Sequence, residues 1–121
     1  MMRRLVVLLA ALFLTGPVIG QEIPEASRKD LWCGLAFTMA ARDVPADAAP
    51  EILAVTDPYK RGAELLVGRA KAVHLESGYT PEAFDALASK TEADIAAQLS
   101  STDPAIAPLY SFEDCAALIG L

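Results

Sequence analysis

Few side chains in this chain could bind a metal. His74 is the only histidine, and Cys33 and Cys115 are the only cysteines. Metals such as zinc need several His, Cys or carboxylate ligands that meet at one point. Glu76, two residues after His74, would lie on a different face of a helix. The sequence therefore predicts no metal site, and we expect a partly exposed His74 near the negative end of a helix.

Three close pairs of carboxylates could in principle serve acid–base chemistry. The pairs are Glu82 with Asp85, Glu92 with Asp94, and Glu113 with Asp114. Helix caps and solvated helix faces explain such pairs more simply. A serine nucleophile would need a base, and the single histidine lies on an unrelated face. Gly62 and Gly68 fall inside a helical pattern, not in a phosphate-binding loop. We therefore predict no catalytic residue, no cofactor and no enzymatic activity.

The first twenty residues have the order of a secretory signal peptide. Arg3 and Arg4 precede the apolar run Leu5–Leu14, and a small-residue exit ends at Gly20. A membrane span would need about 20 apolar residues, and Pro17 interrupts this shorter run. We predict cleavage after Gly20, a periplasmic location and one domain over residues 21–121, with an uncleaved anchor as the alternative.

Charge and composition narrow the classes of partner. The whole chain carries a net charge of −6, and removal of Arg3 and Arg4 leaves eight basic against sixteen acidic residues, or −8. Nucleic acid is disfavoured as a partner because binding it requires clustered cations. We also expect no membrane association once the leader is removed. An acidic surface that only aids solubility and one that captures a basic protein both remain open.

Apolar residues recur at helical spacing, and no long run alternates with the period of a strand. The first helix is predicted over Glu25–Arg42. It is apolar almost all round, so we expect it to be the central element, with Trp32, Leu35, Phe37 and Met39 as its large contacts. A short helical turn is possible at residues 51–55.

Three further helices follow between turn signals. The second is predicted to begin at Pro58, after a break at Thr56 and Asp57, and to stop at Gly78. Thr80 and Ser111 are expected to cap the third and the last. The inner faces are predicted to contain Tyr59, Ala63, Leu66, Ala70 and Val73, then Phe84, Leu87, Ala88, Ile95 and Leu99, then Phe112, Cys115, Ala116 and Ile119.

The two cysteines fall on the inner faces of the first and last predicted helices. In an oxidising compartment an even number of cysteines favours a bridge, so we predict a Cys33–Cys115 disulfide. Redox-active pairs usually lie two residues apart, and two free thiols remain possible if the chain is not exported. The predicted fold is an all-α bundle of three long helices plus a short C-terminal helix, stapled between its first and last helices. Gly34 and Gly62 are expected where helices cross closely.

Two short cysteine motifs carry a family resemblance. Leu31–Trp32–Cys33 lies early, Tyr110–Ser111–Phe112–Glu113–Asp114–Cys115 lies late, and alanine-rich helices separate them. This resembles the small exported two-cysteine helical proteins of Gram-negative bacteria, which implies a compartment and a fold but no activity. There is a fainter similarity to periplasmic acid-stress chaperones of the HdeA type, whose cysteines lie closer together.

Three functions fit these observations. The first is a non-enzymatic periplasmic interaction or stress protein, which would expose apolar surface at low pH. The second is a small-ligand-binding module with a pocket between the first and second helices, near Trp32 and Tyr59. The third is an acidic inhibitor or immunity protein that blocks a basic hydrolase.

Overall fold

The computed structural model describes residues 22–121, and this part of the chain is helical without strands. The helices are α1 (Glu25–Arg42), α2 (Pro50–Glu76), α3 (Pro81–Ser100) and α4 (Phe112–Ala117). The predicted all-α class, with three long helices and a short C-terminal one, is confirmed. The predicted signal peptide, residues 1–20, lies outside the described residues. None of the described helices is long and apolar enough to cross a membrane.

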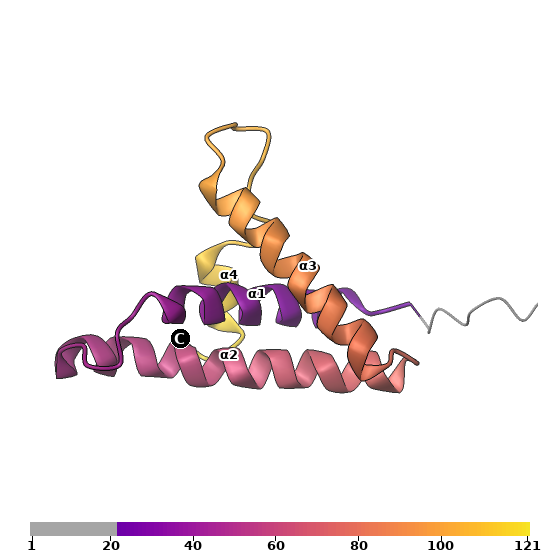
Figure 1. Ribbon diagram of the computed structural model, residues 1–121, viewed down its shortest axis with the longest axis horizontal. Helices are drawn as coiled ribbons and strands as arrows, with labels where there is room; N and C mark the ends of the chain where they lie inside the picture. The colour runs from indigo at the N-terminus through magenta and orange to yellow at the C-terminus, as the bar shows by residue number, and fades with distance from the viewer. Residues whose placement is uncertain (1–21) are drawn as a thin grey trace, which may run out of the picture.

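Helices α1 and α2 lie side by side and antiparallel, and α3 crosses them obliquely (Figure 1). The C-terminal part of α3 rises away from this pair. The loop after α3 then brings the chain back so that α4 lies beside α1. Because α3 diverges from the pair, the bundle is open on the side where the loop returns.

Helix α1 has the bounds that the sequence predicted and is the central element. Eight of its residues are buried, among them Trp32, Leu35 and Phe37, whereas Met39 is partly buried. Gly34 lies at the crossing with α2, where a Cβ atom would stand 2.8 Å from Val67 Cγ2. The expectation of a close helix crossing at Gly34 is therefore confirmed.

The predicted break before Pro58 is wrong, because α2 runs without interruption from Pro50 to Glu76 with Pro58 inside it. Proline has no N–H group to donate to the carbonyl group four residues earlier. Here that carbonyl group belongs to the exposed Ala54, so water can bond to it instead. One turn away, the Thr56 hydroxyl donates to the Ile52 carbonyl oxygen at 3.0 Å. The ring of Tyr59 packs against Phe37 of α1 with centroids 5.2 Å apart. Tertiary packing thus outweighs the local preference for a break.

The predicted stop at Gly78 and the predicted caps of α3 and α4 are confirmed. Gly78 has φ 99°, and the backbone N–H groups of Gly78 and Tyr79 donate to the carbonyls of Leu75 and His74, the Schellman pattern that closes a helix. The hydroxyls of Thr80 and Ser111 accept hydrogen bonds from backbone N–H groups in the first turns of α3 and α4.

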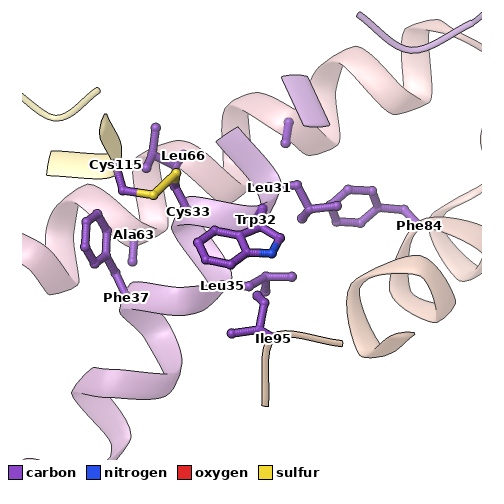
Figure 2. Packing of buried hydrophobic residues seen from close by; sticks show 11 residues of the cluster. Leu31, Trp32, Cys33, Leu35, Phe37, Ala63, Leu66, Phe84, Ile95 and Cys115 are labelled. Atoms are coloured by element: carbon purple, nitrogen blue, oxygen red, sulfur yellow. A yellow bond between two sulfur atoms is a disulfide. The ribbon is translucent and has the colours of Figure 1, made fainter. Parts of the chain in front are cut away.

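The core gathers around the disulfide that joins α1 to α4 (Figure 2). Cys33 and Cys115 are bonded with their Cα atoms 5.2 Å apart, and both are almost completely buried. Their bridge lies among Leu66 and Ala63 of α2 and Phe37 of α1. The predicted staple between the first and last helices is therefore confirmed.

Two residues predicted on inner faces are instead exposed. Leu99 of α3 is 59% exposed and Phe112 of α4 is 63% exposed. Leu99 lies in the last turns of α3, where that helix has diverged from α1 and α2. Phe112 is the first residue of the short α4, whose buried face is formed by Cys115 and Ala116. Helical periodicity identified the inward-facing side of each helix. It did not show how far along each helix that side is covered by neighbouring helices.

Candidate functional site

Two cavities lie on either side of Trp32. The larger, which we call the Trp32 cleft, has a volume of about 640 Å³ and lies between α1 and α3. The segment before α1 and the segment before α4 also contribute to its lining. It is lined by Glu22, Ile23, Glu25, Arg28, Leu31, Trp32, His74, Tyr79, Leu87, Lys90, Thr91, Asp94, Gln98, Leu109 and Tyr110.

The second cavity, which we call the Phe112 groove, has a volume of about 520 Å³ and is mainly apolar. Its walls come from α1, the end of α3, and the segment that leads into α4. It is lined by Trp32, Ala36, Phe37, Ala40, Leu99, Pro108, Tyr110, Ser111, Phe112 and Cys115. Leu99 and Phe112, the two unexpectedly exposed side chains, therefore both line this groove.

Trp32 and Tyr110 form the wall that the two cavities share. Their rings meet edge to face with centroids 5.6 Å apart, a favourable arrangement for aromatic rings. Trp32 is only 5% exposed, so the indole is part of the core as well as a lining residue. Figure 2 shows the indole six-membered ring toward Phe37 and its nitrogen toward Leu31 and Leu35.

The predicted ligand-pocket residues Trp32 and Tyr59 line different cavities. Tyr59 faces a small cavity of about 140 Å³ between α1 and α2, which Phe37 and Phe112 also line. The rings of Tyr59, Phe37 and Phe112 form a cluster with centroid separations of 5.2 to 5.9 Å. Tyr59 therefore supports one end of the Phe112 groove, whereas Trp32 separates the groove from the cleft.

His74 is buried, and the expectation of partial exposure is wrong. Only 1% of it is exposed, and its ring meets those of Tyr79 and Phe84 edge to face. Its Nδ1 lies 2.7 Å from the Ala70 carbonyl oxygen, which can only accept, so Nδ1 carries the hydrogen. The turn at Gly78 folds Tyr79 back over this end of α2. That local reversal of the chain was not evident from helical spacing.

Tyr110 is tied to the first turn of α1 by a hydrogen bond from its hydroxyl to the Glu25 carboxylate. Burial, and then this hydrogen bond, raise the pKa of Tyr110 to about 12. Both effects favour the neutral phenol. The bond ties the segment before α4 to the start of α1, and both residues line the Trp32 cleft.

Two ion pairs lie among the charged residues that line the cleft, which also include Glu22. Arg28 lies 2.9 Å from Glu25, and Lys90 lies 3.2 Å from Asp94. Both pairs are well exposed to solvent, so each contributes little to stability. The lining thus has three carboxylates, Glu22, Glu25 and Asp94, and two cations, Arg28 and Lys90.

The three carboxylate pairs do not converge on either cavity as a group. Asp94 lines the cleft but is paired with Lys90, while Glu92 binds Arg42 at 2.9 Å. The other two pairs, Glu82 with Asp85 and Glu113 with Asp114, are exposed near helix starts. Among residues 22–121, no cluster of three or more His, Cys, Asp or Glu side chains is placed to hold a metal ion.

An ion pair between Asp30 and Arg69 was not predicted from residue types and spacing. The buried Asp30 carboxylate accepts two hydrogen bonds from the guanidinium of the half-exposed Arg69, at 2.7 and 2.8 Å. These hydrogen bonds raise the pKa of Arg69 above its usual value, although desolvation acts in the opposite direction. The fork geometry fixes the register of α2 against α1 near the cleft.

No protein-family model, curated protein or solved structure matches this chain.

Proposed function

We propose that this protein is a non-enzymatic, exported interaction module that binds another protein through the Phe112 groove. One observation carries the proposal: Leu99 and Phe112 stand exposed on either side of a groove whose floor is formed by buried aromatic residues. Aromatic and aliphatic side chains around a desolvated pocket are typical of the energetic centre of a protein interface. Exposed apolar side chains that gather in this way favour binding to a partner.

The groove suits an apolar side chain or short segment of the partner. The small side chains of Ala36 and Ala40 on α1 leave room beside the aromatic floor, and Pro108 adds a flat apolar surface. A bound partner would cover these side chains and remove them from water.

The acidity of the chain favours a partner that is basic around this apolar segment. Glu113 and Asp114 follow Phe112 directly and are both exposed. The net charge over the whole chain is −6. Such a field accelerates association with a positively charged surface and disfavours acidic partners.

The test compares two double variants in cells that produce the protein naturally. Leu99→Gln with Phe112→Ser removes both sides of the groove, whereas Val55→Gln with Leu65→Gln alters two exposed apolar residues of α2 that do not line it. Partners are fixed by cross-linking, captured and quantified by mass spectrometry. We expect one basic partner at equal stoichiometry with the natural protein and the α2 variant, and about tenfold less with the groove variant.

Circular dichroism shows whether each variant is folded, and Leu99→Gln alone serves if Phe112→Ser unfolds the protein. Equal capture by the folded groove and α2 variants would contradict the proposal. If the captured partner is a basic hydrolase whose activity falls on binding, the interaction is that of an inhibitor or immunity protein.

A further inference from the structure

We infer that one face of α2 binds the same face of a second copy of this chain, with the two helices antiparallel. Figure 1 shows α1, α3 and α4 on one side of α2. On the opposite side, residues recur at alternating spacings of three and four, and we call them the outer face of α2: Pro58, Arg61, Leu65, Gly68, Ala72 and Leu75. All of them except the half-buried Pro58 are exposed within residues 22–121. This is the spacing at which two helices pack along their length.

The first observation is that two leucines of the outer face are in contact with solvent. Leu65 is 57% exposed and Leu75 is 38% exposed, whereas the neighbouring Leu66 is completely buried. Leu65 lies near the middle of a 27-residue helix, so its exposure does not come from a frayed end. A second helix laid along this face would remove both side chains from water.

The second observation is a helical glycine that no contact within residues 22–121 explains. Gly34 and Gly62 lie against side chains of neighbouring segments, whereas a Cβ atom at Gly68 would meet nothing within 4 Å. Glycine disfavours a helix relative to alanine, so it is unexpected at an open position. A second copy would use the open space, because its Leu65 can pack against Gly68 as a knob fits a hole.

The third observation is the balance of charge on α2. This helix has four acidic and four basic side chains, whereas the rest of residues 22–121 has twelve acidic and four basic ones. Two acidic copies repel one another, and the charges of α2 add nothing to that repulsion. The acidity that disfavours other acidic partners therefore does not exclude contact through this helix.

Glu64 and Lys71 determine the orientation of the pair. They flank the outer face on the same side, two helical turns apart, and neither forms an ion pair in the described part of the chain. If Leu65 of each copy packs over Gly68 of the other, Glu64 of each approaches Lys71 of the other. In a parallel pair, by contrast, Arg61 would face the same residue of the second copy, and like charges would repel.

The geometry also leaves Lys71 free to turn toward a second copy. In the single chain its Nζ lies 6.0 Å from the centroid of the Phe84 ring, at the outer limit of a cation–π contact. Arg69, on the other flank of the face, is already bound to Asp30 and keeps that partner. Two symmetric Glu64–Lys71 pairs would thus form without breaking an ion pair of the single chain.

The test exchanges the two charges. Glu64→Lys alone and Lys71→Glu alone each place like charges opposite one another twice, so each variant should form a dimer about tenfold more weakly than the natural protein. A mixture of the two variants restores both opposite-charge pairs and should form a mixed dimer as tightly as the natural protein does. Sedimentation equilibrium gives the dissociation constants, and native mass spectrometry with one variant labelled with nitrogen-15 identifies the mixed dimer. A single helix pair is a small interface, so we expect a natural dissociation constant of about 1–100 μM.

The matched control makes the same charge changes on α3. Glu82→Lys and Lys90→Glu are exposed positions away from the outer face, so each variant should dimerise like the natural protein. Gly68→Leu fills the space for Leu65 of the second copy without a clash in its own chain, and should weaken the dimer about tenfold while remaining folded. Circular dichroism shows that each variant is folded.

Three results would overturn the inference. The natural protein could remain monomeric up to about 1 mM. The two α2 charge variants could dimerise as well as the natural protein, or their mixture could form no mixed dimer. Loss of the dimer in Leu99→Gln with Phe112→Ser, but not in Gly68→Leu, would place the contact at the groove.

The inference fails separately from the function proposed above. No residue of the outer face lines the Phe112 groove. The variant Val55→Gln with Leu65→Gln should therefore lose the dimer and still capture the protein partner, and a monomeric natural protein could capture it too.

Discussion

Among single residues, Trp32 and Tyr110 have structural roles that their positions in the sequence do not suggest. Trp32 belongs to the core and lines both cavities, and Tyr110, which also lines both, is bonded to Glu25 at the start of α1. Trp32, which precedes Cys33, and Tyr110, which lies five residues before Cys115, thus form the wall between the two cavities. Their role arises because the disulfide brings the end of the chain beside α1.

The raised pKa of Tyr110 predicts an alkaline loss of stability. The phenol has an ordinary pKa of 10.0 and a folded pKa of about 12, so its contribution to folding is fully present below pH 10 and is lost as the pH rises toward 12. We expect the difference in unfolding free energy between the natural protein and Tyr110→Phe to be constant below pH 10 and to shrink from there to pH 12. Urea denaturation at a series of pH values measures it.

Tyr59→Phe is the matched control, since it also removes one phenol hydroxyl but leaves the Tyr110–Glu25 bond in place. This variant should follow the pH dependence of the natural protein. A difference between the natural protein and Tyr110→Phe that stayed constant through pH 12 would show that the folded state does not hold Tyr110 in its neutral form.

At the scale of helices, the glycines of α1 and α2 differ in what surrounds them. A Cβ atom at Gly34 would meet the Val67 side chain at 2.8 Å and the Val67 backbone nitrogen at 3.0 Å. At Gly68, one residue along α2 from that contact, a Cβ atom would meet nothing within 4 Å. A substitution at Gly34 therefore tests whether close packing requires glycine, whereas a substitution at Gly68 tests helix propensity alone.

We expect opposite effects from alanine at these two positions. Gly68→Ala should stabilise the protein by up to about 1 kcal/mol, because alanine favours the helix and nothing obstructs its methyl group. Gly34→Ala should destabilise it by about 1–3 kcal/mol, since the crowded backbone of Val67 must move. Chemical denaturation of both variants gives the two values. A stabilised Gly34→Ala would mean that α1 and α2 do not approach as closely as described here.

For the molecule as a whole, the disulfide holds the C-terminal helix α4 against α1. Helix α4 has only six residues and buries chiefly Cys115 and Ala116, so it has little apolar area of its own to hold it against α1. The covalent bond to Cys33 fixes it there. Both cavities use residues next to α4, which makes their shape depend on this bridge.

Removal of the bridge by Cys33→Ala with Cys115→Ala should lower the free energy of unfolding by as much as about 4.5 kcal/mol, the chain-entropy value for a loop of this length. A typical domain has only about 5–15 kcal/mol of stability, so the variant is expected to be partly unfolded at moderate temperature. Thermal and urea unfolding measure the change, with the reduced natural protein as a second route to the same state. A loss below about 1 kcal/mol would show that packing alone holds α4.

Local chemistry made several parts of this structure predictable. The bounds of α1, the caps at Thr80 and Ser111, the stop at Gly78 and the Cys33–Cys115 bridge all follow from residue types that act on their immediate neighbours or on one unique partner. The continuity of α2 through Pro58 did not follow, because contacts with α1 compensate for the hydrogen bond that proline cannot make.

Residue patterns were enough to predict the helical class, the order of the helices and the disulfide between the first and last of them, since periodicity, capping and cysteine number are local or countable properties. The burial of His74, the exposure of Leu99 and Phe112, and the position of Trp32 between two cavities became evident only in the folded chain. These outcomes depend on the angle at which α3 leaves α1 and α2 (Figure 1). That angle results from the packing of many side chains at once, which no short stretch of residues encodes.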